Sequence, residues 1–259
     1  MLSFTVLGSG SAGNCAVVAS ENCRLLVDAG LSARQIARRL EITGIAPEQL
    51  DGILLTHEHS DHICGLAVFC RKFDIPIYAN RQTAEVVKGI VRGENRNWQL
   101  FTTGSAFSVK DITIESFDVP HDAVEPVGFV LHNGGSSLGV VTDLGLATKL
   151  LLERIRRVSA LLIETNYDEK LLQADTRRPW SIKQRIQSRH GHLSNDAAAA
   201  VIAELANHNL RRAVLGHLSR DCNEPSLAIG TVRARLGVDC GIDVVCATQS
   251  EPTVTMPVE

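Results

Sequence analysis

The sequence predicts an α/β protein in which two β-sheets are flanked by outer helices. Two observations support this class. Short β-type runs cluster in the first half of the chain and recur near its end, and segments with helical periodicity lie between them. An all-parallel doubly wound sheet would require a more regular alternation of strands and helices. We expect a single domain over residues 1–259, because no repeat, low-complexity tract or Pro/Ser-rich linker divides the chain.

The strands are predicted from short aliphatic or β-branched runs bounded by turn residues. They are Ser3–Leu7, Cys15–Ala19, Arg24–Val27, Ile53–Thr56, Ile112–Val119, Val127–Leu131, Ser137–Val141, Ala160–Ile163, Ala213–Gly216 and Asp243–Cys246. Ser32 can cap a first helix, which carries Ile36 and Leu40 and ends near Gly44. Helical periodicity predicts further helices over Asp61–Lys72, Thr83–Ile90, Thr148–Arg157, Asn195–Asn207 and Ser226–Leu236.

Composition excludes several classes of protein. The hydrophobic share of 44% and the charged share of 21% exclude a disordered or fibrous chain. No run approaches the roughly 18 apolar residues of a transmembrane helix, and no Lys or Arg precedes the apolar start as in a signal peptide. The seven cysteines contain no CxxC pair, which is typical of free thiols in a reducing cytoplasm. We therefore predict a cytoplasmic protein with no membrane partner.

Charge is unevenly distributed along the chain. The formal net charge is −3, which alone argues against a nucleic-acid binder, but residues 149–189 carry ten Lys or Arg against five Asp or Glu. Such a basic segment is either a solvated helical face or a surface that binds polyanions. Aromatic residues make up only 4% of the chain, so a base-stacking platform for single strands is not expected.

Residues Gly8–Gly13 match the GxGxxG pattern of a dinucleotide-binding turn, and Asp28 lies 20 positions after Gly8. That mechanism needs a helix to begin at the loop, with its N-terminus facing the pyrophosphate. The following residues, Asn14–Ala19, instead predict a strand. We interpret the segment as the tight turn of a β-hairpin that can line a site.

The strongest functional signal is Thr56-His-Glu-His-Ser-Asp-His62, directly after an apolar strand. His57 and His59 are two residues apart, so both imidazoles can point the same way and bind one cation. Asp61 and His62 can serve a second cation. Three histidines and two acids in six residues are hard to explain as packing, because uncompensated polar burial is costly. Mixed imidazole and carboxylate ligands suit Zn, Mn or Fe rather than Ca.

Further candidate ligands lie at the ends of other predicted strands, namely His121, Asp143 and His217. Each alone is typical of a solvated turn, but together with the histidine cluster they predict convergence at one sheet edge. A carboxylate such as Asp143 can bridge two ions about 3.5–4 Å apart, the separation found in two-metal hydrolytic sites.

This order of motifs resembles the metallo-β-lactamase superfamily, from Asp28, the usual supporting acid, to His217. The resemblance implies a four-layer αββα sandwich of two mixed β-sheets with a dinuclear site at one edge. It implies two divalent metal ions per chain, Zn or Mn, with Fe as a further option. The ligands it implies are His57, His59 and His121 for the first ion, Asp61, His62 and His217 for the second, and Asp143 between them.

Two features exclude some branches of this superfamily. True lactamases have Cys where Asp143 stands, and nucleases with a cap domain insert a much longer segment than the 74 positions that separate Asp143 from His217. We therefore expect no cap-domain insertion. The chain resembles tRNase Z and, more closely, the YycJ/WalJ (VicX) group of bacterial metallo-hydrolases. The motifs shared with that group are Ser9–Asn14, His121–Phe129, Thr142–Gly145, Glu164–Asp168 and Arg185–Asn195.

Two positions depart from the pattern of the group. Cys64 stands where a polar or basic residue is usual. Asp175–Trp180 differs from the usual tyrosine-proline turn, and because it lies in the basic stretch it is placed to alter substrate contacts.

The resemblance implies phosphodiester hydrolysis, in that group by a 5′→3′ exonuclease acting on double-stranded DNA. The residues are consistent with this chemistry, because two ions lower the pKa of a bridging water and the resulting hydroxide can attack phosphorus. We expect Asp61 to belong to the catalytic set. We expect His192 to stabilise or protonate the leaving 3′-oxygen and Glu164 to orient His192.

Contacts to phosphate and to the DNA backbone are expected from a wider set of polar and basic residues. These are Ser11, Asn14, Ser194, Asn195, Arg177, Arg178, Lys183, Arg185 and Arg189. Two alternatives stay open: a hydrolase of small thioesters, lactones or phosphoesters with the same dinuclear core, and a metal-binding regulatory protein without turnover.

Overall fold

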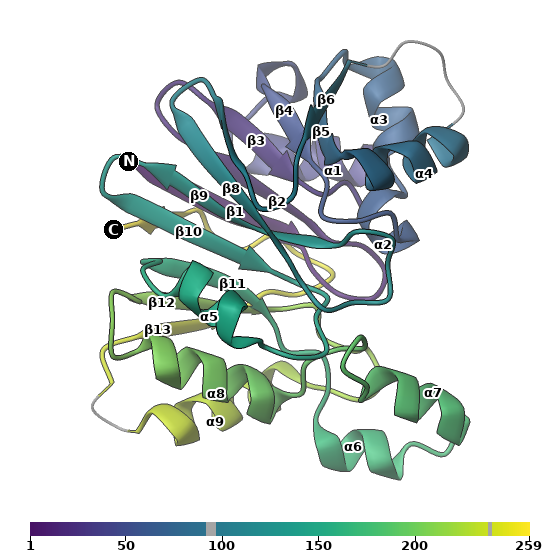
Figure 1. Cartoon of the computed structure of the whole chain (residues 1–259), viewed down its shortest axis with the longest axis vertical. Helices are drawn as coiled ribbons and strands as arrows, with labels where there is room; N and C mark the ends of the chain where they lie inside the picture. The colour runs from purple at the N-terminus through teal and green to yellow at the C-terminus, as the bar shows by residue number, and fades with distance from the viewer. Residues whose placement is uncertain (92–96, 238–239) are drawn as a thin grey trace.

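Two seven-stranded β-sheets form the centre of the computed structural model, which describes residues 1–91, 97–237 and 240–259 (Figure 1). In sheet order, the first contains β14 (Met256–Val258), β1 (Leu2–Gly8), β2 (Cys15–Ala19), β3 (Arg24–Val27), β4 (Gly52–Leu54), β5 (Ile77–Asn80) and β6 (Trp98–Phe101). The second contains β13 (Asp243–Cys246), β12 (Arg212–Gly216), β11 (Ala160–Glu164), β10 (Ser136–Val141), β9 (Val127–Asn133), β8 (Ile112–Asp118) and β7 (Ala106–Val109).

Both sheets change from antiparallel to parallel pairing at their fourth strand. Strand β3 pairs antiparallel with β2 and parallel with β4, and β10 pairs antiparallel with β9 and parallel with β11. The carboxyl ends of β3, β4, β10, β11 and β12 therefore supply the loops from which the candidate site is built.

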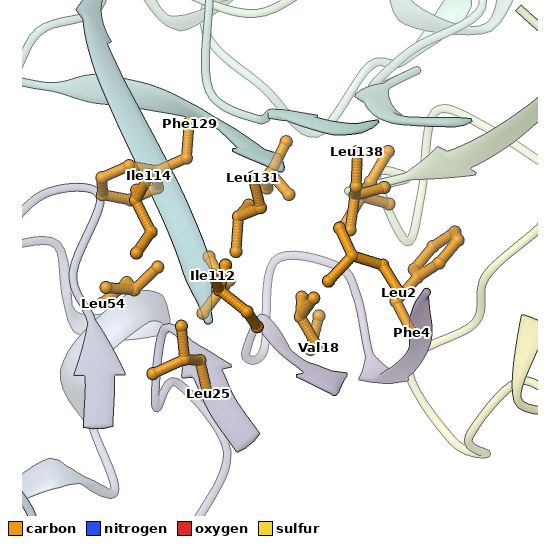
Figure 2. Close-up of a cluster of buried hydrophobic side chains, with 14 of the residues drawn as sticks. Leu2, Phe4, Val18, Leu25, Leu54, Ile112, Ile114, Phe129, Leu131 and Leu138 are labelled. Carbon is orange, nitrogen blue, oxygen red and sulfur yellow. The ribbon is translucent and has the colours of Figure 1, made fainter. Parts of the chain in front are cut away.

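The main hydrophobic core lies between the two sheets (Figure 2). Successive residues of each central strand face opposite layers, as in β3, where Leu25 and Val27 enter this core while Leu26 packs on the outer face. Because both faces are covered, these strands are apolar throughout and not alternately polar.

Helices cover the outer faces of both sheets (Figure 1). The first sheet is flanked by α1 (Ala33–Ile42), α3 (Leu66–Lys72) and α4 (Arg81–Val91), and the second by α5 (Lys149–Ile155), α8 (Asn195–Leu205) and α9 (Pro225–Leu236). Four short helices lie elsewhere in the described ranges. They are a 3-10 turn at Pro47–Gln49, α2 (Ser60–Ile63) in the candidate site, and the pair α6 (Glu169–Ala174) and α7 (Trp180–Ile186), which projects from the sandwich in Figure 1. Within the described ranges, no helix combines the length and apolar character needed to cross a bilayer.

The predicted αββα layering is confirmed, and each predicted strand is present with small shifts of its ends. Ser32 caps α1 through a capping box with Gln35, as its position suggested. The single helix predicted over Asp61–Lys72 is wrong, because the chain forms α2 and α3. The Gly65 amide between them donates to the Ala29 carbonyl at 2.8 Å, which diverts it from the helical ladder.

Strands β5, β6, β7 and β14 and helices α6 and α7 were not predicted. Each of these strands has only three or four residues.

Candidate active site

A pocket of about 280 Å³ opens where the carboxyl ends of strands from both sheets meet. Most of its wall comes from the segments that follow β1, β4, β8, β10 and β12 and from the connection between α7 and α8, and one side is closed by α7. The lining residues are Ser11, His59, Asp61, His121, Asp122, Asp143, Ile182, Arg185, Ile186, Gly191, His192 and His217.

The first group of candidate ligands consists of His57, His59 and His121, whose nearest ring nitrogens all lie within 4.8 Å of one another. His57 is buried, and its Nδ1 is 3.0 Å from the Thr56 hydroxyl. His121 is buried too, and its Nδ1 lies 3.0 Å from the Gly191 carbonyl, which accepts a hydrogen bond from it. These contacts orient the His57 and His121 rings so that the Nε2 atom of each points toward the other candidate ligands of the group.

The second group consists of Asp61, His62, Asp143 and His217, again within 4.8 Å. Asp143 Oδ2 lies 2.9 Å from His62 Nε2, and its Oδ1 lies 3.0 Å from His217 Nδ1. Asp61 Oδ2 lies 3.4 Å from His217 Nε2 and 3.6 Å from His62 Nε2. All of these side chains except Asp61 are buried.

Three residues at strand ends adopt the left-handed backbone conformation that non-glycine residues rarely occupy: Asp28 at φ 61°, Asp143 at φ 55° and His217 at φ 53°. Such a conformation costs of order 1–3 kcal/mol, and at functional sites it persists because the surrounding structure requires it. Asp28 uses it to place Oδ2 2.7 Å from His62 Nδ1 and to accept hydrogen bonds from the Thr56 amide and hydroxyl. Asp28 thus orients the His62 ring by contacting Nδ1, the nitrogen opposite the one that faces Asp143.

The ionisable groups of this cluster shift one another's pKa values. Burial opposes ionisation of His62 and His217, but the Asp143 carboxylate raises the pKa of both imidazoles well above the usual value. Burial would raise the pKa of Asp143, yet His217 and His62 hold it well below its usual range. Burial, with His62 nearby, lowers the pKa of His57 well below the usual value. A neutral His57 beside an ionised Asp143 is the state that binds a cation.

Unpartnered buried atoms show that this donor set fits metal ions. Within the described part of the chain, His57 Nε2, His217 Nδ1 and Asp143 Oδ2 have no hydrogen bond of acceptable geometry although all three are buried. Leaving such atoms without a partner is costly, and divalent cations would satisfy all of them. Imidazole and carboxylate ligands of this kind suit Zn²⁺ or Mn²⁺.

The N-terminal turn supports the second group from one side. Asn14 is buried, with its Nδ2 3.3 Å from Asp61 Oδ2 and 3.2 Å from His62 Nε2. Ser9 donates to Asn14 Oδ1 at 3.0 Å and accepts from the His217 amide at 2.7 Å. Ser11 lies on the pocket wall. Asn14 is therefore occupied in holding two candidate ligands, while Ser11 faces the space where a substrate would lie.

His192 and Glu164 form a pair beside the ligand cluster. Glu164 is fully buried at the end of β11 and lies 2.7 Å from His192 Nδ1 through Oε1, while Oε2 accepts from the Leu144 and Leu193 amides. The same Oε1 is 3.1 Å from His217 Nδ1. Burial opposes ionisation of His192, but the Glu164 carboxylate raises its pKa above the usual value. Since Nδ1 is engaged, Nε2 is the atom left to act in the pocket.

Of the five basic residues predicted to contact DNA, the structure places Arg185 at the pocket, where its Nε lies 2.6 Å from Asp122. Arg177 and Arg178 both pair with Asp221. Lys183 is buried, and its Nζ donates to the Gln173 carbonyl at 2.8 Å.

Arg178 also forms an ion pair with Asp175, and Lys183 links α7 to the end of α6. Both residues therefore stabilise the two projecting helices α6 and α7. Arg189 is exposed. Two further residues predicted to bind phosphate lie away from the pocket. Ser194 caps α8 by accepting from the Ala197 amide at 3.2 Å, and the fully buried Asn195 pairs with Asn223.

Sequence reasoning overlooked three contributors. Asp122 holds Arg185, and Ile182 and Ile186 of α7 form the apolar side of the pocket. Asp122 directly follows the candidate ligand His121, so its position in the sequence could have indicated that it lies at the pocket. The two isoleucines carried no signal, because helix α7 itself was not predicted.

Comparison with known proteins places the chain in a family. A family model described as a β-lactamase superfamily domain matches residues 23–218. The chain belongs to the metallo-β-lactamase superfamily. Within it, the chain is 39% identical over 228 residues to exodeoxyribonuclease YycJ of Bacillus anthracis, covering 88% of this chain and 86% of the relative. It is 38% identical over 261 residues to exodeoxyribonuclease WalJ of Streptococcus pneumoniae, covering 97% and 96%.

The crystal structure of the short form of human tRNase Z has the same fold, with a TM-score of 0.67 over 100% of both chains at 17% identity. The resemblance to the superfamily and to its YycJ/WalJ group is therefore confirmed. The roles of the individual site residues in this superfamily member stay predictions.

Proposed function

We propose that this chain is a dinuclear metal-dependent phosphodiesterase that removes nucleotides from double-stranded DNA in the 5′→3′ direction. The single observation that supports it best is the His192–Glu164 pair, 2.7 Å apart, next to the candidate ligands. An alkoxide leaving oxygen gains from a proton donor, whereas the thiolate of a thioester leaves without one. The two relatives named as exodeoxyribonucleases support the choice of DNA.

Two divalent ions, Zn or Mn, would be held here by His57, His59 and His121 and by Asp61, His62 and His217, with Asp143 between the two groups. When bound, such ions supply an acidified water and neutralise charge on phosphoryl oxygens. Asn14, Asp28 and Thr56 keep the ligand side chains in place through the contacts described above.

His192 supplies the proton in this proposal. The Glu164 carboxylate raises the pKa of the imidazole and so favours its protonated form, in which Nδ1–H faces Glu164 and Nε2 carries the second proton. Transfer of the Nε2 proton to the leaving 3′-oxygen releases a 5′-mononucleotide. Asp61 serves in catalysis as a ligand whose carboxylate also faces the pocket.

The surroundings of the pocket are suited to a nucleic-acid backbone. A volume of about 280 Å³ admits a phosphate and its sugar, so the remainder of a duplex would lie outside. Arg185 would exchange Asp122 for a phosphate, and Ser11 would donate to a phosphoryl oxygen from the opposite wall. Arg189 is exposed and available for the next phosphate along the backbone.

We further infer that residues 1–259 act as one domain without a cap, because α6 and α7 are the only elements in the described ranges that project from the sandwich (Figure 1). A cytoplasmic location agrees with seven free thiols.

The test uses linear duplex DNA with a 5′-phosphate, labelled separately at each end, in the presence of Mn²⁺ or Zn²⁺. We expect the 5′ label to appear first as a mononucleotide with the wild type. We expect no release by His57→Ala and normal release by His208→Ala, a matched change at a histidine that pairs with Arg156 far from the pocket.

Release of the 3′ label first would refute the direction, and cleavage of RNA in preference to DNA would refute the substrate. If neither nucleic acid is cleaved while a thioester or phosphoester is hydrolysed, the small-molecule alternative replaces the proposal.

A further inference from the structure

An apolar groove separates α1 from α3 on the outer face of the first sheet, away from the candidate active site. It encloses about 480 Å³, and its floor is made by Ala33 and Ala37 of α1 and by Val68, Phe69 and Phe73. The two alanines are one helical turn apart, which leaves room above them for a side chain from outside. The centroids of the Phe69 and Phe73 rings lie 4.9 Å apart, and both side chains are buried.

Apolar side-chain surface of this groove is exposed to solvent. Val68, which lines the groove, is 56% exposed. Isolated exposed apolar residues are common, but this one borders a concave surface whose floor is apolar as well. This combination is typical of a site that receives a large apolar side chain.

The rim of the groove is basic. Arg34 and Arg38 stand on α1, Lys72 stands on α3, and Glu41 is the one carboxylate among the lining residues. Within the described ranges, none of these three cations forms an ion pair with a carboxylate. Lys72 instead lies 4.9 Å above the Phe73 ring, where it covers the apolar floor.

Arg39 on the same helix shows the contrast. Its side chain points inward, and it donates to the carbonyls of Leu7, Gln249 and Ser250. The fold therefore uses Arg39, whereas Arg34 and Arg38 on the outer side of α1 have no internal role.

We propose that this groove docks an acidic peptide segment of a partner protein. The segment inserts one large apolar side chain between α1 and α3 and sets its carboxylates against Arg34, Arg38 and Lys72. A nucleic-acid backbone would satisfy the rim but offers no apolar group for the floor. A second copy of this chain would bring its own basic rim against this one, and like charges in contact are unfavourable. This proposal does not depend on the nuclease activity.

The test is a selection of random twelve-residue displayed peptides on the immobilised full-length protein. We expect the enriched sequences to share a Phe, Trp, Leu or Met flanked by at least two Asp or Glu residues. A fluorescein-labelled synthetic version should bind with a Kd of about 10–100 μM, as for a small transient interface, and more weakly at 0.5 M salt because charge attraction is screened.

Two variants locate the binding site. Val68→Glu blocks the floor and Arg38→Glu reverses the charge of the rim, and both residues are on the surface, so we expect native circular dichroism spectra. Each should weaken peptide binding at least tenfold. The matched changes Leu150→Glu, at a residue 64% exposed on α5, and Arg233→Glu on α9 should leave it within twofold. Nuclease activity should be unaffected by all four.

Other outcomes overturn the proposal. Failure to enrich any sequence, or enrichment of peptides without acidic residues, would contradict it, as would unchanged binding by Val68→Glu and Arg38→Glu. If the protein is a dimer by light scattering and Val68→Glu makes it monomeric, a second copy fills the groove. If Arg38→Glu weakens duplex DNA binding and no peptide is enriched, the rim belongs to a DNA surface.

Discussion

Substitution of Gly30 by alanine tests whether the close approach of three backbone segments sustains the candidate site. Gly30 lies in the loop after β3, where its amide donates to the Asn14 carbonyl at 2.9 Å. The Asn14 amide in turn donates to the Asp61 carbonyl at 2.8 Å. An ideal Cβ on Gly30 would lie 1.7 Å from the Asp61 carbonyl oxygen and 2.7 Å from the Asn14 amide nitrogen. The obstacle is backbone, so no side-chain rotation relieves it.

The cost follows from these contacts. The segments must separate enough to break both hydrogen bonds, each worth about 1 kcal/mol, and overpacking adds about 1–3 kcal/mol. We expect Gly30→Ala to lower the free energy of unfolding by about 3–5 kcal/mol, which for a chain of this size lowers the Tm by about 10 °C. The same displacement moves Asp61, so metal affinity should fall as well.

The assay is urea and thermal unfolding followed by far-UV circular dichroism in EDTA, so that lost metal binding does not contribute. Gly230→Ala is the matched control, because a Cβ there meets nothing within 4 Å and the residue lies in α9. That change should stabilise the protein by about 0.5–1 kcal/mol. A Gly30→Ala protein within 1 kcal/mol of wild type would refute the reasoning.

Three further predictions concern the chemistry of the site. Glu164→Gln should slow DNA cleavage about 100-fold and shift the histidine limb of the pH–rate profile to lower pH, because His192 loses its carboxylate; an unchanged profile would exclude His192 as the acid. The metal-free protein should lose stability as the pH rises above about 6.5, since His62 and His217 have raised pKa values and the folded state then holds more protons than the unfolded state. Thermal unfolding in EDTA checks this, and a Tm that stays flat or increases as the pH rises would contradict it. Arg185→Gln should weaken DNA binding equally for all sequences and reduce the slope of log K against log salt by about 1, whereas the same change at an exposed α9 arginine should not.

The sequence was informative wherever one local pattern sufficed. The spacing of His57 and His59 after an apolar strand, and of His121, Asp143 and His217 after later strands, predicted side chains at strand ends, and the structure brings them within a few ångströms of one another. Ser32 at the start of α1 is a similar case, because a capping box involves residues only three positions apart.

Prediction was weakest for polar residues whose partners are distant in the sequence. Arg178 and Lys183 belong to a basic segment, but Asp221 and the Gln173 carbonyl engage them and only the fold brings those partners near. Asn195 was expected at a phosphate, yet it pairs with Asn223 in a fully buried position. Charge counts and cap positions describe a residue, whereas its role depends on which partner the fold supplies.

The architecture explains why the ligands meet where they do. Strands β3 and β10 hold the same place in the two sheets, the point where antiparallel pairing gives way to parallel pairing. Each is followed by an aspartate in a left-handed conformation, Asp28 and Asp143, and the two carboxylates contact opposite nitrogens of His62 at 2.7 and 2.9 Å. At such a switch point the neighbouring connections leave in different directions and open a crevice at the strand ends. One histidine fixed from both sheets thus ties the candidate metal centre to the packing of the whole sandwich, so a change in how the sheets pack would alter the geometry of the ligands.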